Sequence, residues 1–440
     1  MPTAIVIGGG LSGLAAAAAL GGADFDVELF ESRPFLGGRA TSYALNTGAD
    51  SETIDNCQHI LLRCCVNLLD FYHRLGVQDR IEFHREFYFI EPGGRTSTMH
   101  AGRFPRPFHF TESFARMRCF GLADKVSIGR GLLALQREHN RRQDLDRITM
   151  LDWLREKKQT PRAIERFWQQ ILVSAVNEQL DRMAASHGFQ VFWLGFLGTR
   201  DSYQMGVPAV PLSELYSEEA WGRTGNVKLS PRSPVERVVA DRGQVRGVVV
   251  GGVERRADYY VLCVPFERVG GLLPELELQL GGFTHSPITG IHLWFDKKIT
   301  DLPHATLLDR TIQWMFNKAD GKYLQLVVSA SRGLVDMPRA DVIALGVREL
   351  AEFFPEVRDA ALEKAHIVKE VRATFSAQPG LETQRPGQAT RFTNLFLAGD
   401  WTRSGWPATM EGAVRSGYLA AEGVTKAIGS PRQFLLPDVA

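Results

Sequence analysis

Short apolar runs, glycine turns and helical periods alternate along the N-terminal part of the chain. Residues Thr3–Ile7 form an apolar, β-prone run, and Gly8–Gly10 follow at once. An alanine-rich segment of helical character then continues to Leu20, and a second apolar run covers Val27–Phe30. Strand, turn, helix and strand in this order predict the start of an α/β fold with a parallel sheet.

The middle of the chain has a different pattern. Its apolar spacing predicts helices over about Glu112–Gln143 and Met150–Val176. It predicts strands around Thr289–Phe295 and Leu324–Ser329. A mixed α+β region is therefore expected inside the α/β part.

The glycine turn carries the first candidate chemistry. Gly8, Gly10 and Gly13 have the GxGxxG spacing, with Leu11 and Ser12 between the last two. Glycines at these points let the backbone turn tightly and approach a pyrophosphate, and the helix start directs free N–H groups at the phosphates. The spacing alone is weak evidence, but the preceding strand and following helix supply the context that a dinucleotide site needs.

An acidic residue follows at the expected distance. Glu31, with Ser32 beside it, ends the second apolar run roughly 20 residues after the glycines. A carboxylate in this position accepts hydrogen bonds from the hydroxyls of an adenosine ribose. We therefore expect Glu31 and Ser32 at the adenosine half of a dinucleotide.

The next segment, Arg33–Ala40, contains Gly38 and Arg39 in a Gly-Gly-Arg sequence. Here the chain begins to resemble the flavin-containing amine oxidase and phytoene desaturase superfamily. The resemblance implies that Gly38 offers bare backbone to the middle of FAD, and that Arg39 supplies charge near its phosphates.

The C-terminal part extends the resemblance. A strand-like run, Asn394–Ala398, ends in Gly399 and Asp400, and a helix is expected to open at Pro407–Ala413. These segments resemble the closing flavin motif of the superfamily, in which the aspartate accepts a ribitol hydrogen bond and the helix N-terminus stabilises negative charge on the reduced ring. The cofactor contacts implied here are Gly399, Asp400, Thr409, Met410 and Ala413.

A central hairpin pattern supplies one more candidate. Val235 lies in Ser233–Val238, and the apolar run Ala257–Pro265 follows. The pair resembles the strands through which these flavoproteins contact adenine by backbone groups. Such a pattern is more often structural, so Val235 is a candidate by resemblance.

Together the segments imply a Rossmann-type FAD-binding domain of the glutathione-reductase-like kind, with an interleaved α+β substrate domain. We expect the FAD-binding domain to comprise residues 1–82, 210–275 and 370–440, and the substrate domain residues 83–209 and 276–369. No cysteine lies in the closing flavin motif, so FAD is expected to be bound non-covalently. No second Rossmann fingerprint is present, so the electron donor is not indicated.

Bulk composition narrows the function further. A formal charge of +1 gives no global reason to expect a nucleic-acid partner. Five cysteines, an odd number without CxxC spacing, favour reduced thiols in the cytoplasm and argue against a metal centre. No run of about 18 apolar residues is present, so a membrane-spanning helix is not expected.

A basic, phenylalanine-rich stretch lies between Phe83 and Arg142. Basic residues outnumber acidic ones there by about two to one, as expected of a surface that contacts an anionic bilayer. The alternative is a solvated helical face over a core stripe. The interleaved aromatics are Phe104, Phe108, Phe110, Phe114 and Phe120. We predict a cytoplasmic protein that docks peripherally on the inner face of the cytoplasmic membrane.

Within the superfamily, several segments are similar to the hydroxysqualene dehydroxylases of bacterial hopanoid synthesis. They are Ile54–His59, Pro287–Thr289, Leu293–Asp296, Gln313–Phe316 and Ala398–Thr402 with Pro407–Thr409. Amine oxidases usually carry a lysine just before the strand that matches Ile291–Asp296, and this chain has no lysine there. They also carry an aromatic residue at the position where this chain has Thr409. The resemblance implies replacement of the allylic hydroxyl of hydroxysqualene by hydride, giving squalene.

Loss of hydroxide needs an acid. The loop after the Gly-Gly-Arg segment offers His59, which can hold a proton near neutral pH, and Asp55, which could orient it. The alternative is that both residues are structural. Trp294 and Trp314 are candidates to line an apolar tunnel.

Two other functions stay open. A carotenoid-type desaturase or isomerase would share the FAD site and the tunnel but transfer hydride from substrate to flavin. A non-catalytic flavoprotein would use FAD structurally and bind a lipid or a partner.

Overall fold

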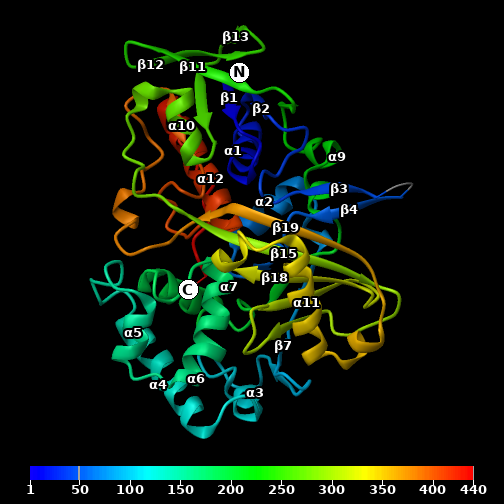
Figure 1. The fold of residues 1–440 in the computed structure, drawn as a ribbon. Helices are drawn as coiled ribbons and strands as arrows, with labels where there is room; N and C mark the ends of the chain where they lie inside the picture. Colours follow the sequence, from blue (N-terminus) through cyan, green and yellow to red (C-terminus); the bar gives the residue numbers. More distant parts are fainter. Residues whose placement is uncertain (48–49, 440) are drawn as a thin grey trace.

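A five-stranded parallel sheet organises one half of the protein (Figure 1). The structure, a computed structural model, describes residues 1–47 and 50–439. The strand order is β10-β2-β1-β14-β20. The strands span Thr3–Ile7 (β1), Asp26–Phe30 (β2), Val227–Ser230 (β10), Tyr259–Leu262 (β14) and Leu395–Leu397 (β20). Because they come from three distant stretches, this half closes only when both ends of the chain meet, and the expected α/β fold class is confirmed.

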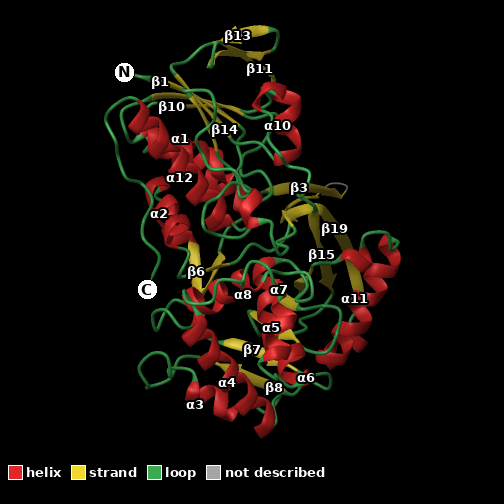
Figure 2. Cartoon of the chain, turned by 90° about the vertical axis from the view of Figure 1, so that its left-hand side faces the viewer, coloured by secondary structure: helices red, strands yellow, loops and turns green. Residues whose placement is uncertain are grey.

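Two helices from opposite ends of the chain pack together on this sheet. They are α1 (Leu11–Gly21), whose residues are all buried, and α12 (Met410–Ala427). At their crossing, a Cβ on Gly417 would lie 2.2 Å from the Ser12 carbonyl oxygen, so the backbones touch. A third helix, α2 (Val66–Leu75), contacts both of them (Figure 2).

A seven-stranded sheet of order β19-β15-β18-β17-β16-β7-β8 organises the other half. Its strands span Leu362–Phe375 (β19), His285–Phe295 (β15), Tyr323–Ser329 (β18), Trp314–Ala319 (β17), His304–Leu307 (β16), Phe87–Ile90 (β7) and Thr96–Met99 (β8). All neighbouring pairs are antiparallel except β16 with β7. Helix α11 (Arg339–Phe353) covers one face, where alternate residues of β15 and β18 form an apolar core. The long strand β19 crosses the domain boundary expected at residue 370.

Helices form the lower end of the molecule in Figures 1 and 2. They are α3 (Thr111–Arg116), α4 (Leu122–Glu138), α5 (Met150–Glu156), α6 (Pro161–Ala163), α7 (Gln170–Val176) and α8 (Ala185–Gln190), with π-helical turns over Ile164–Gln169 and Val191–Phe196. The two long helices expected from the sequence are each interrupted. Gly121 begins a new helix in the first of them, and the Thr160 side chain caps a new start in the second. In the described part of the chain, every helix is too short or too polar to cross a membrane.

Smaller elements connect the halves. They are β3 (Ser42–Thr47) with β4 (Asp50–Asp55), β5 (Leu61–Leu62) and β6 (Ile81–His84) on either side of β9 (Met205–Pro208), the hairpin strands β11 (Val235–Asp241), β12 (Gln244–Val250) and β13 (Val253–Arg255), and helices α9 (Glu218–Trp221) and α10 (Phe266–Leu272). The expected pairing of Val235 with Ala257–Pro265 is wrong. Strand β11 pairs with β12, and the later run forms β14 because its apolar residues are buried in the parallel sheet.

Candidate cofactor and substrate site

The first glycine turn joins β1 to α1, and two of the three glycines in its GxGxxG spacing have no room for a side chain. Gly8 has a φ of +109°, and a Cβ on it would lie 2.7 Å from the Cys263 carbonyl oxygen. A Cβ on Gly13 would lie 1.9 Å from the Gly8 carbonyl oxygen. At Gly10 the nearest atom would be the Gly38 Cα, 4.0 Å away. The turn is therefore closed against the sheet and open at Gly10, the side on which a pyrophosphate would lie.

The second glycine segment lies against the first, backbone to backbone. The Gly37 N–H donates to the Gly9 carbonyl at 2.9 Å, and a Cβ on Gly38 would lie 3.0 Å from the Gly10 Cα. Leu11 and Ser12, in the first turn of α1, are buried beneath. This bare peptide surface suits a dinucleotide, as the resemblance implied for Gly38.

Glu31 braces the same turn. Its Oε2 accepts from the Gly9 N–H at 2.7 Å, and its Oε1 accepts from the Arg33 N–H at 2.7 Å and the Ser32 hydroxyl at 3.0 Å. The Ser233 N–H donates to the Glu31 carbonyl oxygen, which places the start of β11 and Val235 beside it. The residues expected at adenosine thus come together from two distant segments.

Arg39 and Asp400 form an ion pair of 2.6 Å between Nη2 and Oδ2. Arg39 also donates to the Ala373 carbonyl oxygen at 2.6 Å. Gly399, with a φ of +143°, donates its N–H to the Ser416 hydroxyl on α12 at 2.8 Å. The residue expected near the phosphates therefore adjoins the residue expected near the ribitol, as two contacts along one extended cofactor should.

The start of α12 presents the remaining cofactor candidates. Thr409 caps the helix by accepting from the Gly412 N–H at 3.0 Å, and Thr409, Met410 and Ala413 are partly exposed. These three lie on the accessible side of the helix N-terminus, where the dipole favours negative charge.

Glu411, in the same turn, points away from solvent and was not foreseen from the sequence. Its carboxylate accepts from both the backbone and side-chain nitrogens of Asn67, and from the Leu68 N–H at 2.7 Å. It thereby ties α12 to the first turn of α2. Burial raises the pKa of Glu411 to about 7.

The Asp55–His59 loop passes between the glycine turns and the seven-stranded sheet. Asp55 is buried, and its Oδ1 accepts from the Ser42 hydroxyl at 2.7 Å and the Leu212 N–H at 3.1 Å. Its Oδ2 pairs with the Lys318 ammonium at 3.0 Å. Burial alone would raise the pKa of Asp55, but Lys318 and these hydrogen bonds hold it below its usual value. Asp55 is therefore a fixed carboxylate.

His59 is held by a different partner. Its Nδ1 lies 2.7 Å from the Cys57 carbonyl oxygen, so this nitrogen carries the proton and Nε2 is free to accept. Burial lowers the pKa of His59, which leaves the ring mostly neutral at pH 7. His59 and Asp55 both lie in the described ranges, and no hydrogen bond joins them. The expected orienting contact is therefore not formed directly.

Lys318 is the residue that the sequence did not reveal. It lies near the end of β17, at an irregularity of the pairing with β18, and also donates to the Gln58 side chain at 3.1 Å. The sequence showed that no lysine precedes the strand matching Ile291–Asp296 (β15), whereas the fold brings Lys318 from β17, two strands away in the same sheet.

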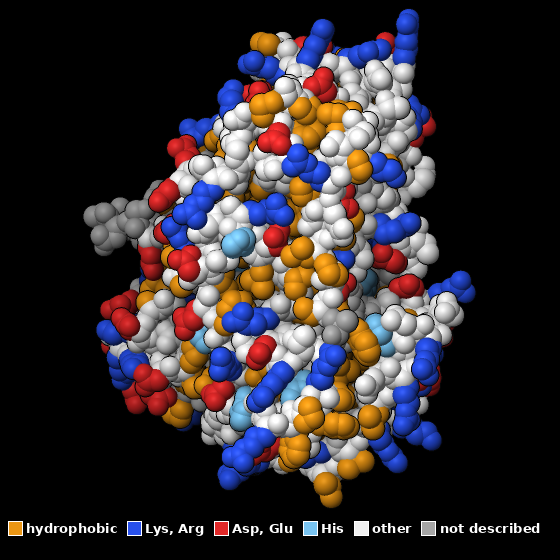
Figure 3. All heavy atoms as spheres, turned by 180° about the vertical axis from the view of Figure 1, so that it is seen from behind, with side chains coloured by type: hydrophobic (Ala, Val, Ile, Leu, Met, Phe, Trp, Pro, Cys, Tyr) orange, Lys and Arg blue, Asp and Glu red, His pale blue; other side chains and the backbone are white. Residues whose placement is uncertain are grey.

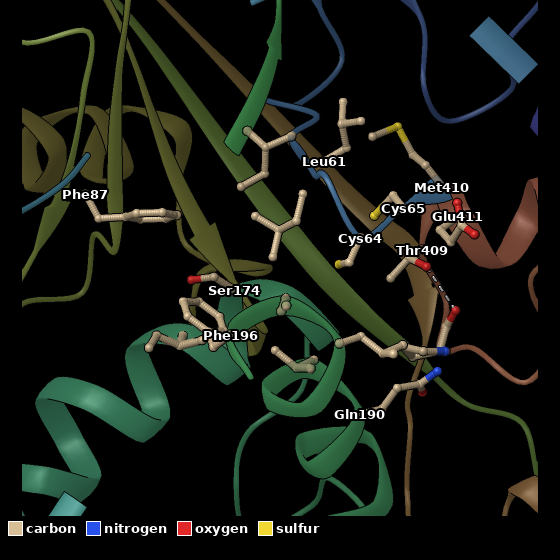
Figure 4. Close-up of a pocket in the computed structure, with 18 of the residues that line it drawn as sticks. Leu61, Cys64, Cys65, Phe87, Ser174, Gln190, Phe196, Thr409, Met410 and Glu411 are labelled. Carbon is tan, nitrogen blue, oxygen red and sulfur yellow. Dashed lines mark hydrogen bonds between the residues drawn. The ribbon is translucent and has the colours of Figure 1, made fainter. Parts of the chain in front are cut away.

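An apolar cavity adjoins the Asp55–His59 loop (Figure 4). Its empty volume is about 1060 Å³, including its open mouth. Figure 4 shows its walls coming from β5 at Leu61, the seven-stranded sheet at Phe87, the helical end at Phe196 and the start of α12 at Thr409. Of the two expected tunnel residues, Trp314 lines it, whereas Trp294 stacks on Tyr323 outside it.

These features together indicate a flavin-dependent oxidoreductase. They are the parallel sheet, the two touching glycine turns, the acidic residue after β2, and the start of α12 beside an apolar cavity. Residues 11–425 match the family of flavin containing amine oxidoreductases, so the chain belongs to that family. FAD is its cofactor, and the open backbone at Gly10 and the accessible start of α12 fit that group.

Relatives match nearly the whole length of the chain. The 15-cis-phytoene desaturase of Synechococcus elongatus is 26% identical over 95% of this chain and 95% of its own. The zeta-carotene desaturase of a Synechocystis species is 24% identical over 95% and 96%. Among solved structures, an oxidoreductase from Methanosarcina mazei shares the fold with a TM-score of 0.70 and 18% identity, covering 94% of this chain and 98% of its own.

Proposed function

We propose that this protein is an FAD-dependent isoprenoid oxidoreductase that converts hydroxysqualene to squalene. The observation that carries the proposal is the apolar cavity, which reaches the start of α12 where Thr409 stands in place of an aromatic residue. Such a cavity suits a long uncharged chain better than an amine. Carotenoid desaturases among the relatives support an isoprenoid substrate.

The reaction removes the allylic hydroxyl as water and puts hydride on the same carbon. Reduced FAD supplies the hydride when bound. The chain must hold the reacting carbon, exclude water from the developing cation and deliver a proton to the leaving oxygen. The apolar walls around Phe87 and Trp314 meet the second demand.

The proton is assigned to the Asp55–His59 loop. His59 directs a ring nitrogen away from its Cys57 contact, and Asp55 holds Lys318 against Gln58. Because burial lowers the pKa of His59, the ring becomes protonated only at a more acidic pH than an ordinary histidine. If His59 is the acid, kcat/KM for hydroxysqualene should fall as pH rises through that lowered pKa.

The rival function is a carotenoid-type desaturase, favoured by the 26% identity to a 15-cis-phytoene desaturase. The direction of electron flow between substrate and flavin distinguishes the two functions. Anaerobic, dithionite-reduced holoenzyme should be reoxidised by hydroxysqualene with formation of squalene, and oxidised holoenzyme should not be reduced by phytoene. The opposite pattern would establish the desaturase, and no reaction in either direction would favour a non-catalytic FAD protein that binds lipid.

The loop is tested by His59→Ala and Asp55→Asn. Both should retain FAD, yet slow flavin reoxidation by hydroxysqualene by about 10²–10⁴-fold, the usual cost of a lost general acid. A substrate analogue with a better leaving group should recover most of the rate. His73→Ala, at an exposed histidine on α2, is the matched control. Wild-type rates in both loop variants, or loss of FAD, would show that the loop is structural.

Peripheral membrane docking is proposed for the helical end. Phe104 and Phe108 are 52% and 57% exposed, and Leu122 on α4 is 80% exposed. Figure 3 shows hydrophobic side chains beside Lys and Arg at this end. The other three phenylalanines of the stretch pack into or against the core, as the alternative anticipated; they are Phe110, Phe114 and Phe120. The exposed pair forms the surface offered to an anionic bilayer.

A further inference from the structure

A row of buried polar side chains crosses the seven-stranded sheet without hydrogen-bond partners for several of its atoms. The unpartnered atoms are Nε2 of His292, both amide atoms of Gln325 and both ring nitrogens of His304. His292 and Gln325 are 0% exposed, and His304 is 1% exposed. Buried polar atoms are normally paired, so such a group of vacant donors and acceptors is where a ligand or an ordered water is expected.

Strand register places these residues on one face. His292 on β15 lies opposite Gln325 on β18, Gln325 lies opposite Phe316 on β17, and Phe316 lies opposite His304 on β16. Directly opposed side chains share a face, with Cβ atoms about 5 Å apart. Neighbours such as Ile291 pack with α11, so the row lies on the other face.

This face adjoins the apolar cavity. Thr306 and Trp314 line the cavity. Thr306 lies two residues along β16 from His304, and Trp314 lies two residues along β17 from Phe316, which stands between Gln325 and His304. Alternate residues of a strand share a face. The row therefore lies on the cavity-facing side of the sheet, beside the residues that line the cavity.

The same face adjoins the Asp55–His59 loop. A Cβ on Gly290 would lie 3.6 Å from His292 Nε2, 3.8 Å from the Asn56 carbonyl oxygen and 3.8 Å from Cys57 Sγ. Gln58 Nε2 is also buried without a partner, while its Oε1 accepts from Lys318. Buried polar atoms without hydrogen-bond partners thus lie on both the sheet and the loop.

The chemistry of these atoms suits a neutral hydroxyl. The two carboxamides offer N–H donors and, on Gln325, a carbonyl acceptor. Burial lowers the pKa of His292 to about 3, so the ring is uncharged at pH 7. Its Nδ1 lies 2.7 Å from the Tyr323 hydroxyl, which leaves Nε2 for another partner. A hydroxyl both donates and accepts, whereas a hydrocarbon can pair with none of these groups.

We propose that Gln325, His292 and Gln58 form a binding site for a hydroxyl oxygen and select an isoprenoid alcohol over the corresponding hydrocarbon. The inference rests on the proposed function, because it names the polar group of the same substrate. The oxygen can belong to the substrate or to a resident water, and the two sources predict different binding data.

The test is ligand binding to oxidised holoenzyme, which has no hydride to give. Dissociation constants for hydroxysqualene and squalene are measured by quenching of tryptophan fluorescence in detergent micelles. Wild-type protein should bind the alcohol on the order of 10-fold more tightly than the hydrocarbon. Gln325→Leu and His292→Leu should bring the ratio close to one without weakening squalene binding. Gln58→Leu changes a residue of the loop, outside the sheet. It tests the site independently if the two sheet variants fail to fold.

Thr306→Val is the matched control, because it removes a hydroxyl that is buried, unpartnered and in the cavity wall. It should retain the alcohol preference. A preference that survives Gln325→Leu, His292→Leu and Gln58→Leu, or that is lost in Thr306→Val instead, overturns the site. Equal weakening of both ligands in the Gln325 and His292 variants overturns it too, because the atoms then hold a structural water.

Turnover separates this inference from the proposed reaction. If wild-type protein prefers the alcohol but does not convert it, the reaction is wrong and the oxygen site stands. If wild-type protein produces squalene while the variants keep the alcohol preference, the oxygen site is wrong and the reaction stands.

Discussion

Substitutions at Gly13 and Gly10 distinguish a glycine required by the fold from one required by the cofactor. In Gly13→Ala the new Cβ would lie 1.9 Å from the Gly8 carbonyl oxygen, whereas real Cβ atoms essentially never approach closer than 3.0 Å. The start of α1 must therefore move from the turn by about 1 Å or more, although the whole helix is buried. We expect FAD-free Gly13→Ala to lose about 1–3 kcal/mol of unfolding free energy.

Gly10→Ala should leave the unfolding free energy intact and weaken FAD binding instead. Gly10 has a φ of −75° and a ψ of 174°, which alanine adopts without strain, and its Cβ would meet nothing closer than 4.0 Å. The FAD-free variant should be as stable as wild type, or more stable by about 0.4–1 kcal/mol through its less flexible unfolded chain. The added methyl stands in the open side of the turn, so FAD affinity should fall at least about tenfold, or 1.4 kcal/mol.

Urea unfolding of the FAD-free proteins and fluorescence titration with FAD measure the two quantities separately. Gly10→Ala that binds FAD as tightly as wild type would refute the placement of the pyrophosphate at this turn. Gly13→Ala with unchanged stability would refute the packing argument.

Three further perturbations test the cofactor site, the buried carboxylate of Glu411 and the surface at the helical end. Glu31→Ala should weaken FAD binding by about 1–3 kcal/mol, since it removes the carboxylate proposed to bind the ribose and releases the Gly9 N–H; unchanged affinity by titration would make Glu31 a bystander. Burial raises the pKa of Glu411 from 4.5 to about 7, so its contribution to stability is present below pH 4.5 and is lost as pH rises to 7. Glu411→Gln should remove a pH-dependent loss of roughly 3 kcal/mol between pH 4.5 and 7 in urea unfolding, and an unchanged slope would contradict the burial argument. Flotation with anionic liposomes should weaken with salt and with Phe104→Ser or Phe108→Ser, whereas binding that ignores lipid charge, salt and both substitutions would exclude this surface.

The sequence determined the strand, glycine turn and helix at the N-terminus because that unit is contiguous and its requirements are local. The turn needs Gly8 and Gly13 where any Cβ would strike backbone, and such steric demands are visible in a short window. The resemblance of the two chain ends to two flavin motifs of one superfamily also predicted that Arg39 and Asp400 serve one cofactor, and the fold pairs them.

Only the tertiary structure decided which polar groups meet on the substrate side. Asp55 and His59 are four residues apart, yet Asp55 pairs with Lys318 and His59 with the Cys57 carbonyl oxygen. The alignment of His292 with Gln325 depends on strand order and register, and a shift of one residue would turn either side chain to the opposite face. Burial by elements distant in sequence then fixes which of these groups are left without partners, because local residue patterns do not specify which strands lie side by side.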